Sequence, residues 1–133
     1  EGDKCTPSGI YSIDQIYYRK DKLTLPTIDF QTTPINKNFG WCDDTTSSHY
    51  NKFIEFPFSD RAEILFREDE IYNIICVISY NTNPIIKNKG SAIFLHVANT
   101  DYSGTAGCLA LKQSDLIELL QNINIDTKIH IVD

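Results

Sequence analysis

The chain has 133 residues, a length that fits a single domain (residues 1–133) with one sizeable hydrophobic core. Its composition of 41% hydrophobic and 23% charged residues is typical of a globular protein, and it contains no apolar run long enough for a membrane-spanning helix. The net charge of −6 repels phosphate backbones and argues against nucleic acid as a partner.

The N-terminal segment shows no basic start followed by an apolar stretch, so no signal peptide is expected in this chain. Methionine is absent throughout, including at position 1, which indicates a processed or excised chain. Residues 1–9 are polar and turn-rich. Residues 10–18 are rich in Ile and Tyr and predict a strand or hairpin.

Residues 19–38 form a polar connection without clear periodicity. Its charged residues mix both signs, so we expect a solvated face rather than a binding patch at Arg19, Lys20, Asp21 and Lys22. Because long loops in compact domains are often functional, this connection is a candidate wall of a substrate groove.

Residues 41–49 bring together several chemically active side chains: Trp41, Cys42, Asp43, Asp44 and His49. Their spacing matches none of the paired Cys and His motifs of zinc sites, so no metal site is expected. The simplest interpretation is a turn in which the Asp side chains accept backbone N–H groups while the Trp packs. A cleft wall with a carboxylate near an amine-bearing substrate is compatible with that turn.

Residues 51–58 contain three Phe residues that favour packing against the core, and Pro57 favours an edge or a strand end. Asp60 and Glu63 have the spacing of a helix capping box, which predicts a short helix through Phe66. Arg67 follows. It could bind a substrate carboxylate through two parallel hydrogen bonds, but surface pairing with a nearby acidic residue is favoured.

Residues 71–80 are β-branched and almost continuously apolar, which predicts a strand buried on both faces. Cys76 lies within this run and is expected to be a buried free thiol. The chain has four cysteines, and Cys5 and Cys42 could pair if the compartment is oxidising.

Residues 91–97 form another apolar run, with His96 near its end, and a polar loop at 99–104 separates it from Cys108. A nucleophilic cysteine needs a base that favours the thiolate and backbone donors that hold an oxyanion. The small residues before Cys108 free the backbone N–H groups around Gly107 for that role. The alternative is that both side chains are ordinary packing residues.

The C-terminal part predicts a helix and a strand. Apolar residues from Leu116 to Ile123 follow one helical face, with Ser114 as the N-cap and Asp115 in the first turn. Residues 128–132 predict a last strand, with His130 facing solvent.

The chain resembles the L,D-transpeptidase catalytic domain (YkuD-like) family over nearly its whole length. The matching segments are Thr6-Pro7-Ser8-Gly9, Gly40-Trp41-Cys42-Asp43-Asp44 with Tyr50-Asn51, Arg67-x-Asp69-x-x-Tyr72, Phe94-Leu95-His96, and Thr105-Ala106-Gly107-Cys108-Leu109-Ala110-Leu111. The resemblance implies a mainly β (α+β) fold: a YkuD-like sandwich or mixed sheets, short helices, and one helix packed after the catalytic cysteine. It also implies that N-terminal strands of the domain are missing from this chain.

The resemblance further implies acyl transfer on peptidoglycan stem tetrapeptides through a thioester, in the cell envelope and without a cofactor. The catalytic residues would be Cys108, His96 and Gly107. Substrate-binding residues would be Thr105, Ala106, Trp41, Arg67 and Tyr80.

One position departs from the family pattern. Ala106 stands where most members carry a second histidine, which leaves the preference for the acceptor open. The alternatives are an L,D-carboxypeptidase, a peptidoglycan amidase on the same fold, or a non-catalytic peptidoglycan-binding module. The oligomeric state is also left open.

Overall fold

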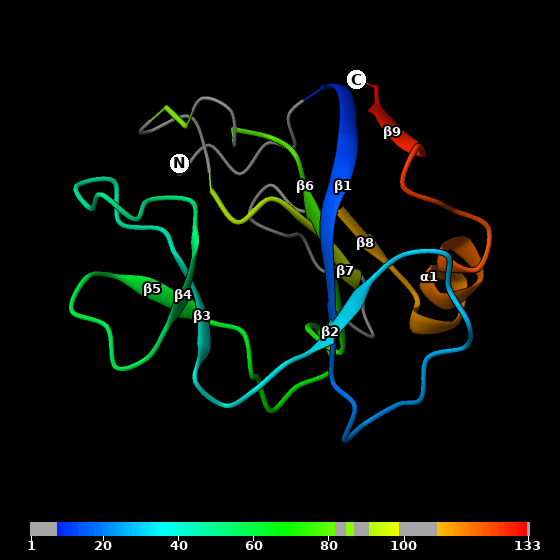
Figure 1. Cartoon of the computed structure of the whole chain (residues 1–133), viewed down its shortest axis with the longest axis horizontal. Coiled ribbons are helices and arrows are strands. Elements are labelled where there is room, and N and C mark those ends of the chain that lie inside the picture. Colours follow the sequence, from blue (N-terminus) through cyan, green and yellow to red (C-terminus); the bar gives the residue numbers. More distant parts are fainter. Residues whose placement is uncertain (1–7, 82–84, 87–90, 99–108, 133) are drawn as a thin grey trace.

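A computed structural model describes residues 8–81, 85–86, 91–98 and 109–132, which form two β-sheets and a single short helix (Figure 1). The larger sheet has the order β2-β1-β6-β7-β8, with β9 paired to the other part of β1. Its strands are β1 (Gly9–Tyr18), β2 (Thr32–Pro34), β6 (Ile74–Ile78), β7 (Phe94–Val97), β8 (Leu109–Leu111) and β9 (Lys128–Ile131).

The smaller sheet has the order β4-β3-β5 and is antiparallel throughout. Its strands are β3 (Phe39–Cys42), β4 (Phe53–Glu55) and β5 (Ala62–Ile64). The small sheet and the helix α1 (Gln113–Leu120) lie on opposite sides of the larger sheet (Figure 1). The mainly β, α+β class expected from the sequence is therefore confirmed.

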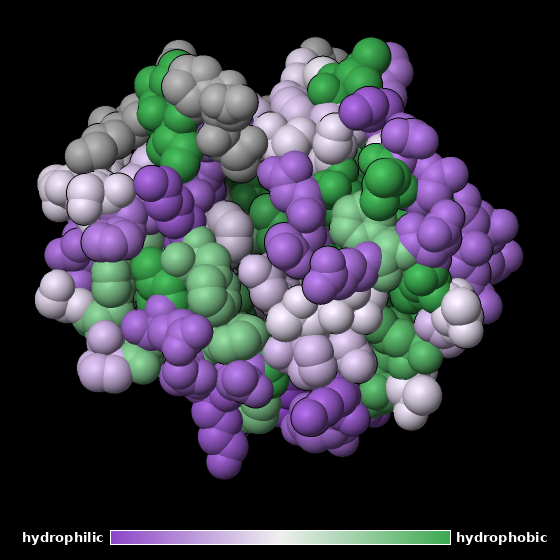
Figure 2. All heavy atoms as spheres, in the orientation of Figure 1, coloured by the Kyte–Doolittle hydropathy of each residue, from purple (hydrophilic) through white to green (hydrophobic). Residues whose placement is uncertain are grey.

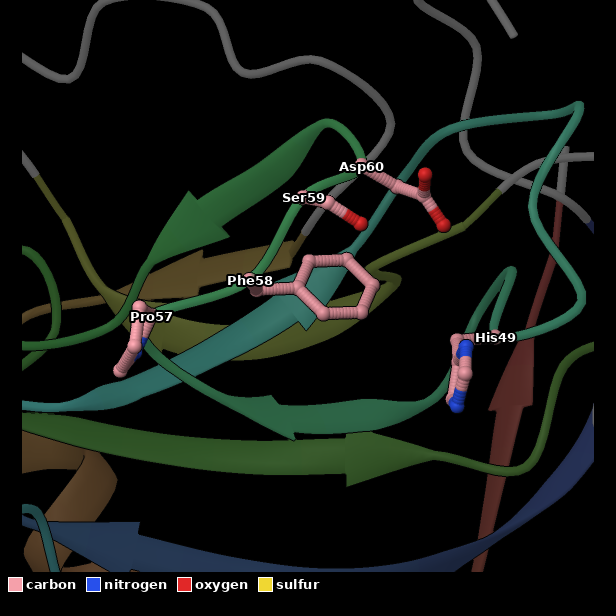
Figure 3. A pocket seen from close by; sticks show the side chains of 5 residues that line it. All are labelled: His49, Pro57, Phe58, Ser59 and Asp60. Carbon is pink, nitrogen blue, oxygen red and sulfur yellow. The ribbon is translucent and has the colours of Figure 1, made fainter.

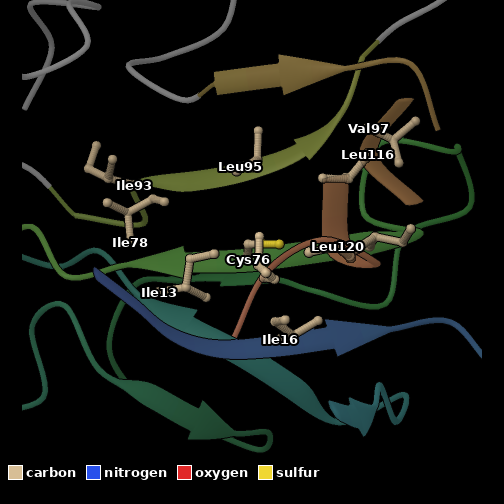
Figure 4. Close-up of a cluster of buried hydrophobic side chains, with 11 residues drawn as sticks. Ile13, Ile16, Cys76, Ile78, Ile93, Leu95, Val97, Leu116 and Leu120 are labelled. Atoms are coloured by element: carbon tan, nitrogen blue, oxygen red, sulfur yellow. The ribbon is translucent and has the colours of Figure 1, made fainter. Parts of the chain in front are cut away.

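Strand alternation divides the core between the two faces of the larger sheet. On the face that carries α1, Leu95 and Val97 of β7 pack with Leu116 and Leu120 of the helix and with Cys76 of β6 (Figure 4). On the other face, Phe94 packs against Trp41 of the small sheet, with ring centroids 5.4 Å apart. His96 is two residues from Phe94 along β7 and therefore faces the small sheet.

Several expected elements are confirmed. The long strand at β1, the fully buried strand at β6, the helix after residue 112 and the last strand at β9 all form where the hydrophobic pattern places them. Pro57 follows the end of β4, and His130 is exposed on β9. Cys76 and Cys42 are both buried free thiols, whereas Cys5 lies outside the described residues.

The expected helix at residues 60–66 is wrong. Residues 62–64 form β5, which pairs with β3 so that Trp41 lies opposite Glu63. Asp60 does not cap a helix, because its carboxylate accepts the Ser47 hydroxyl at 2.5 Å. Pairing with a strand distant in sequence thus outweighs the local capping signal.

The helix α1 also begins two positions earlier than expected. Lys112, rather than Ser114, occupies the N-cap and offers no side-chain hydrogen bond, while Asp115 lies in the first turn as predicted. The residues that α1 buries, Leu116 and Leu120, are one turn apart and face the larger sheet.

Arg19 is not part of a solvated face, because only 4% of it is exposed. Its guanidinium donates to both carboxylate oxygens of Asp21, at 2.8 and 2.7 Å, and to the carbonyl of Arg67. It also lies over the Phe66 ring, 3.5 Å from the centroid. An arginine can be buried in this way since each nitrogen of its flat guanidinium donates a hydrogen bond.

The segment 23–30 also does not take the expected position in the wall of a substrate groove. Their apolar side chains are half-buried against the core cluster on the α1 side, which is the face opposite His96; they are Leu23, Leu25, Ile28 and Phe30. On the face shown in Figure 2, hydrophilic side chains (purple) surround several apolar areas (green).

Candidate active site

His96 lies on a strand that is paired on both sides. In β7 it is opposite Ile75 of the antiparallel β6 and opposite Ala110 of the parallel β8. Two ladders fix the backbone at this residue, and strand alternation directs its ring toward the small sheet. The apolar run at residues 91–97 therefore places an imidazole at a rigid position.

The imidazole of His96 is held in one tautomer. Its Nδ1 lies 2.9 Å from the carbonyl oxygen of Val97, and because a carbonyl can only accept, Nδ1 carries the proton. In the neutral ring, Nε2 then carries the lone pair. Burial lowers the pKa of His96 below 6.5, although the hydrogen bond to Val97 acts in the opposite direction. The side chain is thus a neutral base near pH 7.

Tyr72 forms one wall beside this imidazole. Its ring centroid lies 5.6 Å from that of His96 and 5.7 Å from that of Phe94, in edge-on arrangements. The Tyr72 hydroxyl donates a short hydrogen bond to Oε1 of Glu63. Burial raises the pKa of Glu63 above its ordinary value, although this hydrogen bond acts in the opposite direction.

Glu63 was missed as a site residue because the sequence pattern placed it in a helix. The β3–β5 register sets it directly opposite Trp41, so both side chains lie on the same face of the small sheet. The resemblance did carry a signal for Tyr72, which belongs to the Arg67-x-Asp69-x-x-Tyr72 pattern.

Arg67 pairs with Asp69, as the sequence analysis favoured. Nε and Nη2 donate to the two oxygens of Asp69 at 2.9 and 2.5 Å, and the guanidinium carbon lies 5.3 Å from the Tyr72 ring centroid. Within the described residues, Nη1 of Arg67 has no protein partner. The arginine side chain is 39% exposed, so this edge of the guanidinium can reach a ligand.

Trp41 packs, as expected, and is connected to the site through Phe94. Its indole N–H donates to Oδ1 of Asn51 at 2.9 Å, and the same oxygen accepts the backbone N–H of Ala92 at 3.2 Å. The structure thus brings Trp41, Arg67 and His96 to the face between the two sheets.

Tyr80 lies elsewhere. Its ring is 5.9 Å from that of Tyr11 and packs on the core cluster of the α1 side, which is the face opposite His96. Cys108, Gly107, Thr105 and Ala106 lie outside the described residues.

The residues around Asp44 form the turn that the sequence predicted. Asp44 accepts the backbone N–H of Thr46 at 3.0 Å and that of Arg61 at 3.2 Å. No group of three metal-ligand side chains occurs in the described part of the chain. A shallow pocket of about 620 Å³ beside this turn is lined by His49, Pro57, Phe58, Ser59 and Asp60 (Figure 3).

A comparison with known families gives a match over nearly the whole chain. The family model described as the L,D-transpeptidase catalytic domain (YkuD) matches residues 1–131. Neither the curated proteins nor the solved structures gave a match. Among the described residues, no helix has the length and apolar character needed to cross a membrane.

Proposed function

Because the chain belongs to the L,D-transpeptidase catalytic domain family, which acts on peptidoglycan, we propose that it is a cysteine-dependent acyltransferase of stem tetrapeptides. In this proposal Cys108 is the nucleophile, His96 is the general base, and the backbone N–H groups around Gly107 bind the oxyanion. The cell envelope is the proposed location.

The observation that carries the proposal is the state of His96. Its Nδ1 is committed to the Val97 carbonyl, and its buried ring is neutral, so Nε2 is free to take a proton. The pairing of β7 with β8 supports a position for Cys108 close to His96. Leu109, the residue after Cys108 in the sequence, is paired with Leu95, the residue before His96.

Cys108 and His96 are sufficient to carry every bond change and proton transfer of the proposed reaction. Nε2 of His96 takes the thiol proton of Cys108, and the thiolate attacks the carbonyl carbon that follows the L-centre of diaminopimelate. The C–N bond breaks, His96 protonates the leaving amine of D-alanine, and a thioester remains. An amine on a second stem then attacks the thioester, its proton passes through His96 to the sulfur, and a 3→3 crosslink forms. Water in place of the amine gives a carboxypeptidase.

The substrate would lie beside Arg67, at the solvent-exposed edge of the core that the two sheets share. Arg67 supports this assignment, since its Nη1 edge points to no protein acceptor in the described part of the chain and can bind a stem carboxylate. Trp41 would support the site through its contact with Phe94. Thr105 and Ala106 would contact the stem peptide near the Cys108 thiol. Tyr80 is left out of the proposed site because it packs on the opposite face.

A carbapenem tests the thiol chemistry, since opening its β-lactam ring acylates a reactive active-site cysteine. We expect one adduct by intact mass, located at Cys108 by peptide mapping, and none in Cys108→Ala protein. A defined disaccharide-tetrapeptide, with and without an amine acceptor, then separates crosslinking from hydrolysis. Cys76→Ala is the matched control and should keep activity; turnover by Cys108→Ala protein would refute the assignment.

A further inference from the structure

Glu63 is a carboxylate inside the site that the proposed mechanism does not use. It lies on β5 opposite Trp41, on the face of the small sheet that is directed toward β7. Its Oε1 accepts the Tyr72 hydroxyl, and within the described residues its second oxygen accepts no hydrogen bond. Glu63 is half-buried, and its second oxygen is not among the fully buried unpaired atoms of the described residues.

Tyr72 holds Glu63 in place, and the nearby Arg67 charge favours its ionised form although burial opposes it. Tyr72 fixes one oxygen and contacts the His96 ring, so a single side chain joins the carboxylate to the candidate base. Arg67 is the nearby cation, but its guanidinium is engaged by Asp69 through two hydrogen bonds. A partly desolvated carboxylate with one open oxygen attracts a cation more strongly than an exposed one.

We propose that Glu63 binds the ammonium group of the amine acceptor, while Tyr72 holds the carboxylate toward the site. This inference rests on the proposed function and names the residue that selects the second substrate. An ammonium group donates up to three hydrogen bonds, which matches an open carboxylate oxygen. Tyr72 is a positioning residue in this arrangement.

The same carboxylate can activate the acceptor. The ammonium gives one proton to Glu63, and the resulting amine attacks the thioester carbon with its lone pair. A second proton from the nitrogen passes through His96 to the sulfur as the C–S bond breaks. The products are an amide, a thiol and a protonated Glu63, which then releases its proton to solvent.

The decisive variant is Glu63→Gln, which removes the charge but keeps an oxygen that can accept the Tyr72 hydroxyl. Acylation by the tetrapeptide donor should stay within about twofold of wild type. The acceptor concentration for half-maximal crosslinking should rise about tenfold or more, because a hydrogen bond to a charged group contributes about 1.5–3 kcal/mol. Tyr72→Phe should raise it less, since the carboxylate remains but is no longer held.

Glu55→Gln is the matched control: Glu55 is exposed on β4 of the same small sheet and accepts a hydrogen bond from Asn38 at 2.9 Å. Hydroxylamine, an acceptor largely uncharged at pH 7.5, should react equally well with wild type and Glu63→Gln. The inference would be overturned if Glu63→Gln lost as much activity with hydroxylamine as with the charged acceptor. It would also be overturned if Glu63→Gln and Glu55→Gln needed the same acceptor concentration for half-maximal crosslinking.

The two proposals fail in different ways. If carbapenem acylates Cys108 but no amine acceptor is ever used, Glu63 does not bind an acceptor and the acyl-enzyme chemistry stands. If wild-type protein forms no acyl-enzyme with carbapenem or with the tetrapeptide, the proposed function itself is wrong.

Discussion

The indole N–H of Trp41 donates to Oδ1 of Asn51 across 2.9 Å, and both residues are buried. That oxygen also accepts the backbone N–H of Ala92, and the amide nitrogen of Asn51 donates to the carbonyl of Asn81 at 2.6 Å. Asn51, Asn81 and Ala92 all have positive φ angles, of 58°, 55° and 53°. One side chain therefore fastens the small sheet to both described ends of the β6–β7 connection.

Replacing Asn51 with alanine should destabilise the domain strongly. The change leaves the buried Trp41 indole N–H without its acceptor and removes one hydrogen bond from the Ala92 N–H; an unpaired buried group costs about 1–3 kcal/mol. Alanine also tolerates the left-handed backbone less well. We expect a loss of about 3 kcal/mol in the free energy of unfolding, measured by urea titration with the fluorescence of Trp41.

Asn51→Gly separates the two causes, because glycine accepts the backbone angle but supplies no amide. It should recover about 1 kcal/mol relative to Asn51→Ala, the cost of a left-handed non-glycine residue. An Asn51→Ala loss below about 1 kcal/mol would contradict the role assigned to this side chain.

Arg19→Lys is expected to be costly although it preserves the charge. Lysine cannot reproduce the paired contacts with Asp21, the hydrogen bond to the Arg67 carbonyl and the stacking over Phe66 together. The expected loss is about 2–3 kcal/mol by chemical denaturation. Lys20→Ala, at the exposed neighbouring position, should change stability by less than about 0.5 kcal/mol. Similar values for the two variants would show that Arg19 is not needed for packing.

The elements that the sequence predicted well are those whose side chains alternate or repeat strongly. The β6 run is apolar at every position because both faces of its strand are covered, and α1 buries residues one turn apart. His96 was found as a candidate base because it lies near the end of an apolar run, twelve residues before Cys108, in a segment that resembles the family's. Its tautomer and its pKa direction were not predictable, since they depend on the Val97 carbonyl and on burial.

The elements that the sequence mispredicted depend on distant partners. β5 is three residues long, and its pairing with β3 rather than its own pattern makes it a strand. That pairing also sets Glu63 opposite Trp41, so the helix prediction hid a site residue. Arg19 has neighbours typical of a surface, and only the Arg67 carbonyl and the Phe66 ring, far away in sequence, explain its burial.

Cys76 should resist alkylation in the folded protein. Burial raises the pKa of its thiol to about 12, so very little thiolate exists at pH 8, and the side chain has no exposed surface. Iodoacetamide at pH 8 should modify Cys76 only after unfolding in urea, as followed by peptide mass mapping. Native labelling of Cys76 at the rate of a free thiol would contradict the buried position.

The stability that neutral His96 contributes should decline in acid. Because burial lowers its pKa in the folded state, the unfolded chain takes up this proton at higher pH than the folded chain does. The contribution is therefore fully present above pH 6.5 and is lost as pH falls from there toward the folded pKa. The donor acylation rate should also fall only below pH 6.5, when Nε2 becomes protonated.

A difference measurement isolates His96 from the carboxyl groups. The pKa values of Glu63 and Asp14 are raised by burial and change stability with pH in the opposite direction, but they are common to wild type and His96→Gln. The stability of wild type relative to His96→Gln should shrink between pH 7.5 and 5. If the difference for His96→Gln stayed constant in acid, the folded pKa of His96 would not be lowered. If the difference grew in acid, the folded protein would favour the charged ring, which could not serve as the base.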